Sequence, residues 1–130
     1  MEIKKVVVIG SGTMGSGIAA HLCNANIPVT LLDLKTEISE QARDKIYKSR
    51  PPLLLDKSKI NNIKVGNISD DFAEVAEADW VVEAVVERID IKHNLYEKIL
   101  KMWLSLALVL WEVVLPRNYV MQTFLLPYWI

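Results

Sequence analysis

The stretch VVVIGSGTMGSG, residues Val6–Gly17, decides the fold of this chain. Its first four residues are all apolar and β-branched, which predicts a short strand buried on both faces, as in a parallel sheet. The run then breaks into G-x-G-x-x-G at Gly10, Gly12 and Gly15, and a helix is predicted over residues 13–26. A strand, a glycine turn and a helix in this order are typical of a loop whose backbone lies against a ligand.

Strands and helices are predicted to alternate along the rest of the chain. Further buried strands are expected at Val29–Leu32, Ile63–Val65 and Trp80–Val86. Helices are expected over residues 36–49 with Thr36 as its cap, from Ser69 with Asp70 and Asp71 in the first turn, and from Asp90 onward. Residues 53–61 are expected to form a loop with one turn of helix at most. This alternation predicts an α/β fold of the Rossmann type, a doubly wound parallel sheet that is incomplete after its fourth strand.

The glycine loop is predicted to hold a dinucleotide. Gly10 permits the tight turn, Gly12 lets a pyrophosphate approach the backbone, and Gly15 lets helix and strand pack closely. The amides at the helix N-terminus then face the phosphates. The alternative is a glycine turn without a ligand. The loop residues predicted to bind the cofactor are Gly10, Ser11, Gly12, Thr13, Met14 and Gly15.

Asp33 ends the second strand, about 20 residues beyond the glycines. A carboxylate at this place accepts hydrogen bonds from the ribose hydroxyls of the adenosine, and it repels a 2′-phosphate. NAD is therefore favoured over NADP, although Lys35 lies nearby. The alternative for Asp33 is an ordinary turn residue.

Charged residues also interrupt the fourth apolar segment, DWVVEAVVE, at Glu83 and Glu87. A buried carboxylate without a partner is costly, so both are expected near the carboxyl end of the strand, facing the ligand cleft. Lys92 follows in the next helix and is expected to reach back toward Glu87 or the cofactor. The alternative is that Glu83, Glu87 and Lys92 are solvated charges at the rim.

Two long phrases carry a family resemblance: VVVIGSGTMGSGIAAHLCNANIPVTLLD (residues 6–33) and RPPLLLDKSKINNIKVGNISDDFAEVAEADWVVEAVVERIDIKHNLYEKI (residues 50–99). Together they resemble the N-terminal NAD-binding domain of 3-hydroxyacyl-CoA dehydrogenases, especially the long bacterial members. The resemblance implies that the loop Gly10–Gly15 and Asp33 bind NAD, and that Glu87 and Lys92 contact the cofactor within the family's E-A-x-x-E…K pattern. It also implies oxidation of 3-hydroxyacyl-CoA to 3-oxoacyl-CoA in fatty acid β-oxidation by the complete enzyme.

The catalytic phrases of that family, S-N-T-S and H-F-F-N-P, do not occur in this sequence. The histidines present, His21 and His93, are not expected to replace the family's catalytic base. Cys23 is expected to be a packing residue rather than a reactive thiol. By this comparison the chain is expected to bind NAD and to be catalytically incomplete by itself, with no catalytic residue and no metal site assigned.

Composition changes near residue 100. Between Trp103 and Ile130 the only charged side chains are Glu112 and Arg117. We therefore expect a partial NAD-binding domain over residues 1–100 and an atypical apolar tail over residues 101–130, either translated out of frame or placing WLSLALVL (residues 103–110) as a makeshift fifth strand. The apolar run is too short for a membrane span of roughly 20 residues.

Three functions remain open on the sequence. The favoured one is the NAD-binding portion of a 3-hydroxyacyl-CoA dehydrogenase. The others are a stand-alone NAD-binding module that works with a separately encoded partner, and a different Rossmann protein such as a flavin enzyme. A net charge of −1 without a basic stripe argues against nucleic acid, and one cysteine without a signal peptide predicts a cytoplasmic protein. The oligomeric state is not assigned.

Overall fold

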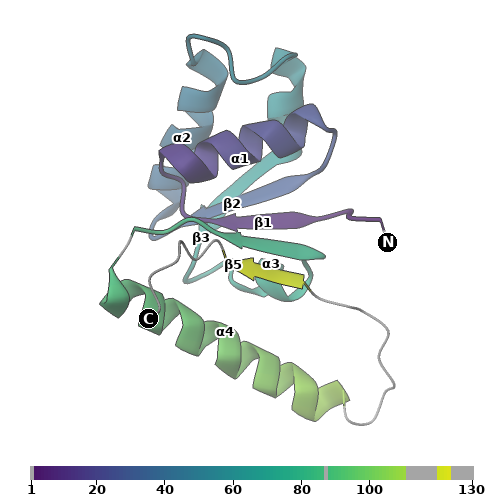
Figure 1. The fold of residues 1–130 in the computed structure, drawn as a ribbon, viewed down its shortest axis with the longest axis vertical. Coiled ribbons are helices and arrows are strands. Elements are labelled where there is room, and N and C mark those ends of the chain that lie inside the picture. The colour runs from purple at the N-terminus through teal and green to yellow at the C-terminus, as the bar shows by residue number, and fades with distance from the viewer. Residues whose placement is uncertain (1, 87, 111–119, 124–130) are drawn as a thin grey trace, which may run out of the picture.

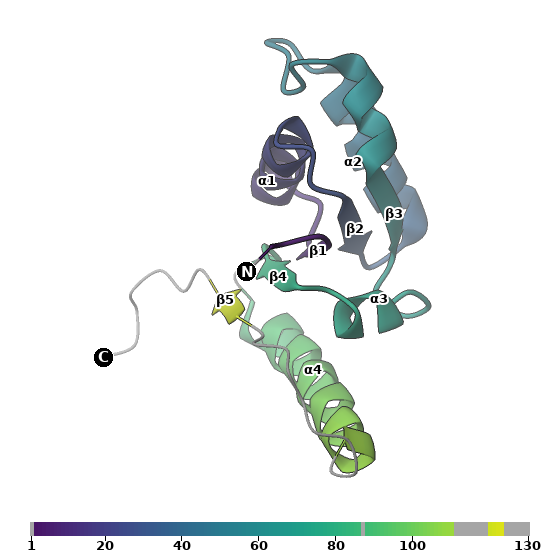
Figure 2. The same ribbon diagram turned by 90° about the vertical axis from the view of Figure 1, so that its right-hand side faces the viewer.

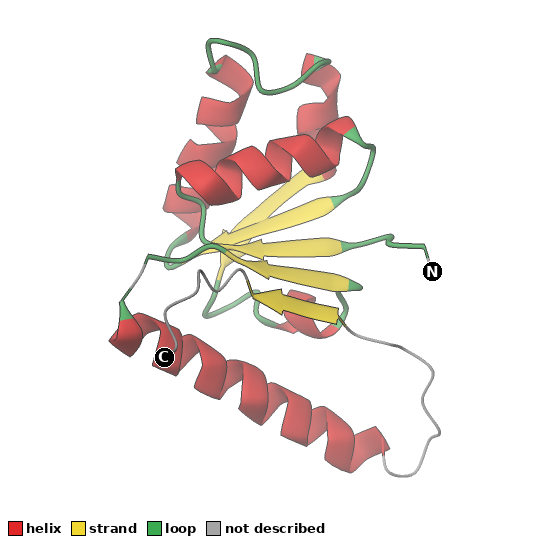
Figure 3. Ribbon diagram, in the orientation of Figure 1, coloured by secondary structure: helices red, strands yellow, loops and turns green. Residues whose placement is uncertain are grey.

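The computed structural model describes residues 2–86, 88–110 and 120–123. These residues form a parallel sheet with the strand order β3-β2-β1-β4-β5, flanked by helices on both faces (Figures 1 and 3). The strands are β1 (Val6–Ile9), β2 (Val29–Asp33), β3 (Ile63–Asn67), β4 (Trp80–Glu83) and β5 (Val120–Thr123). The helices are α1 (Thr13–Asn24), α2 (Thr36–Lys48), the 3₁₀ helix η1 (Lys57–Asn62), α3 (Ala73–Ala76) and α4 (Ile89–Leu110). The predicted Rossmann-type fold is confirmed.

The sheet separates two apolar cores because successive residues of a strand face opposite sides. Val6 and Val8 of β1 pack with α1 and α2 on one face, whereas Val7 and Ile9 pack with α3 and α4 on the other (Figure 2). All four β1 side chains are completely buried. Burial of such a side chain contributes about 1.5–3 kcal/mol each, so β1 is the centre of the domain.

The parallel register brings the carboxyl ends of the strands to one edge of the sheet. Ile9 is level with Leu32 of β2 and with Glu83 of β4. The residues that follow these strands are tied together: Gly10 N donates to Leu32 O at 2.8 Å, and Ala84 N donates to Ile9 O at 2.7 Å. The glycine loop, Asp33 and the end of β4 therefore meet at this edge.

The prediction that a helix begins after Ser69 as its cap is wrong about where the helix starts. The side-chain oxygen of Asn67 accepts from the backbone N–H groups of Ser69 and Asp70, both at 2.8 Å, and so closes a turn instead of a helix. Asp71 Oδ2 accepts from Asn67 N at 2.9 Å. Helix α3 begins only at Ala73 and is four residues long.

Two other boundaries differ from the expectations. Thr36 is the first residue of α2 rather than its cap, and its hydroxyl accepts from the side-chain amide of Asn67 at 2.9 Å. Strand β4 ends at Glu83 rather than Val86, because Val85 N donates to the Glu83 side chain at 2.8 Å and the chain turns away from the sheet.

The expectation that WLSLALVL forms a fifth strand is wrong, because residues 103–110 continue helix α4. This helix is 22 residues long and passes residue 100 without a break. Leu95, Ile99 and Trp103 recur on one face and pack on the core beneath the sheet, which explains the helical choice. The sheet was expected to end after its fourth strand, but it continues. Strand β5 pairs in parallel with β4, from Trp80↔Val120 to Glu83↔Thr123. The division into a body and a tail at residue 100 stays a prediction.

Within the described ranges, none of the helices combines the length and the apolar character that crossing a bilayer requires.

Candidate functional site

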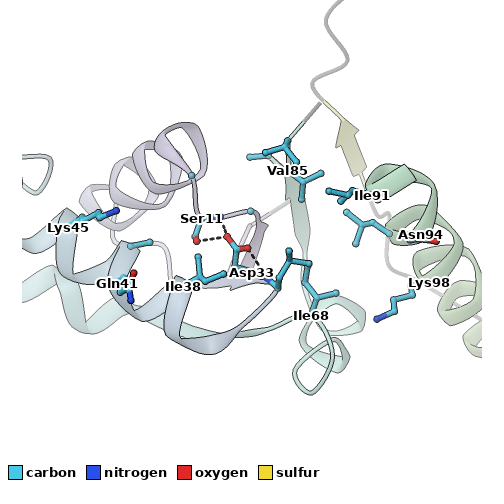
Figure 4. A pocket seen from close by; sticks show the side chains of 17 residues that line it. Ser11, Asp33, Ile38, Gln41, Lys45, Ile68, Val85, Ile91, Asn94 and Lys98 are labelled. Atoms are coloured by element: carbon cyan, nitrogen blue, oxygen red, sulfur yellow. Dashed lines mark hydrogen bonds between the residues drawn. The ribbon is translucent and has the colours of Figure 1, made fainter. Parts of the chain in front are cut away.

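A cleft of about 480 Å³ opens at the carboxyl edge of the sheet. Its floor is formed by Gly10–Gly12 after β1, Asp33 at the end of β2 and Ala84–Val86 after β4, and α2 and α4 form opposite walls (Figure 4). The strand order reverses between β1 and β4, which is where doubly wound sheets bind their ligands. The volume lies within the usual range of small-molecule sites.

Two glycines of the loop are required by close packing. Gly10 has φ +102°, and a Cβ there would lie 2.5 Å from the Ala84 carbonyl oxygen. A Cβ on Gly15 would lie 1.8 Å from the Gly10 carbonyl oxygen, inside any allowed contact. The predicted roles of Gly10 in the turn and Gly15 in helix–strand packing are therefore confirmed in their geometry.

Gly12 differs from these two because its missing side chain leaves open space. No atom lies within 4 Å of the position of its Cβ, and the residue lines the cleft. Gly12 is also the N-cap of α1, where no side chain caps the helix and no acidic residue occupies the first turn. The first N–H groups of a helix have no partner within the helix, so this end of α1 suits an anion.

Thr13 and Met14 follow in the first turn of α1 and do not line the cleft; the Met14 side chain is 64% exposed. Their backbone N–H groups belong to the first turn of α1, the end of the helix that suits an anion. Their contact with a cofactor stays a prediction.

The Asp33 carboxylate is held by the glycine loop. Ser11 donates to Asp33 Oδ2 twice, from its backbone N at 2.7 Å and from its Oγ at 2.5 Å. Leu34 N donates to Oδ1 at 2.7 Å. These bonds fix the carboxylate between the loop and β2, in the middle of the cleft (Figure 4). Asp33 is thus more than a turn residue, since it connects two strand ends across 22 positions of sequence.

Apolar side chains complete the cleft beside Asp33. Leu34 and Ile38 are 62% and 41% exposed, although both are large apolar residues, and Ile68 lies next to them. The four-residue spacing of Ile38, Ala42 and Ile46 in the sequence predicts that all three lie on one apolar face of α2. Only Ala42 and Ile46 are buried; Ile38 lies in the first turn of α2 and faces the cleft. Its place in the first turn of the helix that follows Asp33 is the signal that would have placed it in the site.

Glu83 and Lys92 form a buried cluster with Tyr96. Glu83 Oε2 accepts from the Tyr96 hydroxyl at 2.9 Å and lies 3.7 Å from Lys92 Nζ, while Oε1 accepts from Val85 N. The side chains of Glu83 and Lys92 are only 6% and 12% exposed. The alternative of solvated rim charges is therefore wrong for these two. Glu87 lies outside the described residues, and contact of Lys92 with a cofactor stays a prediction.

The other reactive residue types lie away from the cleft. His21 and His93 are exposed on α1 and α4. Cys23 is completely buried, and burial raises the pKa of its thiol to about 11, as expected for a packing residue. Across the described ranges there is no group of three His, Cys, Asp or Glu side chains arranged to hold a metal ion.

Comparison with known families matches residues 5–110 to the NAD-binding domain of 3-hydroxyacyl-CoA dehydrogenases. A probable 3-hydroxyacyl-CoA dehydrogenase of Deinococcus radiodurans is 40% identical over 116 residues, which cover 84% of this chain and 34% of that protein. A putative fatty acid oxidation complex trifunctional enzyme of Rickettsia felis is 43% identical over 106 residues, covering 76% of this chain and 15% of that protein. The chain thus spans about a third or less of these relatives.

Solved structures show the same arrangement. The 3-hydroxybutyryl-CoA dehydrogenase of Escherichia coli superposes with a TM-score of 0.66 at 27% identity, covering 95% of this chain and 25% of that one. FadB2 of M. tuberculosis superposes with a TM-score of 0.69 at 23% identity, covering 95% and 41%, and supports the fold alone.

Proposed function

The chain belongs to the 3-hydroxyacyl-CoA dehydrogenase family, of which it carries the NAD-binding domain, and from this premise we propose how its cleft holds NAD. The pyrophosphate lies over the loop Gly10–Gly15 at the N-terminus of α1, and the adenosine ribose lies at Asp33. The observation that carries this proposal is the open space at Gly12, beside an uncapped helix N-terminus and in the same cleft as a fixed carboxylate.

The residues present fit each part of the cofactor. The loop offers backbone N–H groups and no acidic side chain to the phosphates. Leu34 and Ile38 present exposed apolar surface beside Asp33, which suits the adenine ring. Ala84–Val86, which follow β4, line the cleft together with Ile91 and Asn94 of α4 and are available for the nicotinamide half.

We extend the proposal to the activity of the family: oxidation of 3-hydroxyacyl-CoA to 3-oxoacyl-CoA. Bound NAD supplies the hydride acceptor. The residues of this chain bind and orient it, and acyl-CoA binding and the catalytic base come from outside the described residues. A cytoplasmic location belongs to the same proposal, supported by a single cysteine that is buried and unpaired.

A stand-alone NAD-binding module that works with a separately encoded partner is the second candidate. One observation favours it: β5 pairs with β4, so the sheet extends beyond its fourth strand. This candidate shares the NAD site and differs only in where the substrate domain is encoded.

NADH binding to the full chain, followed by fluorescence or calorimetry, tests the proposed site. Asp33→Asn is expected to weaken NADH by about 10- to 100-fold, because a hydrogen bond to a charged group contributes about 1.5–3 kcal/mol. Asp44→Asn is the matched control, since Asp44 is an exposed acid on α2 away from the cleft lining. Equal affinity of both variants would exclude Asp33 from the ribose site.

Gly12→Ala tests the pyrophosphate position separately. The new methyl group meets no protein atom, so the melting temperature is expected to stay within a few degrees of the wild type. NADH affinity is expected to fall by about tenfold or more, which corresponds to about 1.4 kcal/mol. Unchanged affinity would place the pyrophosphate elsewhere.

A further inference from the structure

Ser11 is the one side chain of the glycine loop that touches Asp33. Its Oγ donates to Asp33 Oδ2 at 2.5 Å while its backbone N donates to the same oxygen at 2.7 Å. Ser11 is 7% exposed and lines the cleft together with Asp33, and Figure 4 shows the two side chains pointing toward each other. Ser11 occupies a variable position of the G-x-G-x-x-G pattern, which does not require a hydroxyl group there.

The hydrogen-bonding capacity of the pair is limited in a specific way. A carboxylate has about four acceptor sites, two on each oxygen. Both sites of Oδ2 are taken by Ser11, and one site of Oδ1 is taken by Leu34 N. Asp33 by itself therefore has one acceptor site left on Oδ1, whereas an adenosine ribose brings two hydroxyl groups.

Ser11 supplies the missing acceptor. A serine hydroxyl has one proton and two lone pairs, and the proton of Ser11 Oγ is used on Asp33. Within the described part of the chain, no hydrogen bond is donated to Ser11 Oγ. Its lone pairs are thus the nearest additional acceptors to the Asp33 carboxylate.

We propose that Ser11 Oγ and Asp33 Oδ1 together bind the adenosine ribose, each accepting one of its two hydroxyl groups. Because the only proton of the Ser11 hydroxyl is committed to Asp33, the pair offers acceptors and no donor to the ligand. Ribose hydroxyls can donate hydrogen bonds to these two acceptors. A 2′-phosphate at pH 7 can only accept hydrogen bonds, and the negative carboxylate repels it. Ser11 is therefore a ribose-binding and specificity-determining residue. This inference rests on the proposed NAD site and deepens it.

The test compares ADP, 2′-deoxy-ADP and 3′-deoxy-ADP binding by calorimetry to the wild-type chain and to Ser11→Ala. The wild type is expected to lose about 3- to 10-fold in affinity for each deoxy analogue, as for one neutral hydrogen bond. Ser11→Ala is expected to weaken ADP by a similar factor and to become insensitive to the removal of one of the two hydroxyls, the one that Ser11 accepts. Discrimination against the other hydroxyl is retained through Asp33.

Ser16→Ala is the matched control. Its hydroxyl donates to the backbone carbonyl of Ser11 at 2.9 Å and does not reach Asp33. This variant is expected to change the affinities for all three nucleotides by one common factor. Thermal melts of the three proteins establish that each is folded before binding is measured.

Two results overturn the inference while leaving the NAD site in place: a Ser11→Ala variant that weakens all three nucleotides equally, which indicates a structural role, or one that binds ADP more tightly, which indicates that Ser11 competes with the ribose. Failure of the wild type to bind both ADP and NADH overturns the proposed function and this inference together. The two failures are therefore distinguishable.

Discussion

Charged residues are paired differently at the two ends of the parallel strands. We call the side where the strands begin the amino edge and the side where they end the carboxyl edge. At the amino edge, Lys5 pairs with Glu74 at 2.7 Å and with Glu77 at 2.9 Å, and Lys64 pairs with Glu74. Charges of opposite sign thus satisfy each other there. At the carboxyl edge, the Asp33 carboxylate has no cationic partner among the ion pairs of the described residues and is held by neutral donors from Ser11 and Leu34.

The contrast distinguishes a charge that stabilises the fold from a charge that is available to a ligand. A carboxylate that is neutralised by lysines attracts the donor groups of a ligand only weakly. A carboxylate fixed by backbone and hydroxyl donors, such as Asp33, has a defined orientation toward the cleft. Glu83 is intermediate, because it lies at the carboxyl edge but is buried against Lys92 and Tyr96.

The largest effect is expected from the backbone of the carboxyl edge. Gly15→Ala places a methyl group 1.8 Å from the Gly10 carbonyl oxygen, so the loop and α1 must separate. We expect a loss of about 3 kcal/mol or more in the free energy of unfolding, measured by urea denaturation.

Gly17→Ala is the control for this change, because no atom lies within 4 Å of its Cβ and it sits inside the same helix. It is expected to stabilise the protein by about 0.5–1 kcal/mol, the usual advantage of alanine over glycine in a helix. If both variants were equally stable, close packing at Gly15 would not be what holds the loop.

A smaller effect is expected at the buried cluster of Glu83, Lys92 and Tyr96, where a carboxylate at the carboxyl edge does have a lysine partner. Glu83→Gln keeps the shape of the side chain but removes the negative charge facing Lys92 and weakens the bond from Tyr96. We expect a loss of about 1–3 kcal/mol in the free energy of unfolding, by the same denaturation experiment.

Tyr96→Phe separates the contributions, since it removes the hydroxyl and leaves the charge of Glu83 in place. Its expected cost is about 0.5–1.5 kcal/mol, as for one neutral hydrogen bond. A Glu83→Gln variant as stable as the wild type would show that Glu83 resembles the exposed pairs of the amino edge after all.

The smallest effect is expected at the amino edge, and it depends on pH. Hydrogen bonds from Lys5 and then Lys64 hold the pKa of Glu74 below its ordinary value of 4.5. Because the folded-state pKa is the lower one, this contribution to stability is present above about pH 4.5 and is lost as the pH falls through the depressed value. The Glu74→Gln variant lacks this contribution at every pH.

We therefore expect Glu74→Gln to melt about 2–5 °C below the wild type at pH 7, the scale of partly exposed ion pairs. The gap is expected to narrow as the pH is lowered from 7 to below 4.5 and through the lowered pKa of Glu74. Differential scanning calorimetry across this range measures it. A gap that stayed constant with pH would mean that packing, rather than charge, makes Glu74 matter, and the contrast between the two edges would lose one side.

Much of the fold was predictable because its determinants are local. The β-branched run before Gly10 and the apolar spacing of the following helices specify strands and helices within a few residues. The predictions failed where one residue's hydrogen bonds changed a boundary: Asn67 delays helix α3 to Ala73, and Glu83 turns the chain at Val85. In residues 103–110 the helical face of α4 outweighed the strand expectation, because Trp103 reaches the core only as part of that helix.

The sequence alone is enough to place the glycine loop and the acid at the end of the second strand, and hence to identify the family, because glycine at a positive φ and a carboxylate at a strand end are requirements of single positions. Only the tertiary structure decided that Ser11 holds Asp33, that Glu83 is buried against Lys92 and Tyr96, and that Val120–Thr123 joins the sheet beside β4. These contacts join residues far apart in the chain, and they exist only once the parallel register has brought the strand ends to one edge.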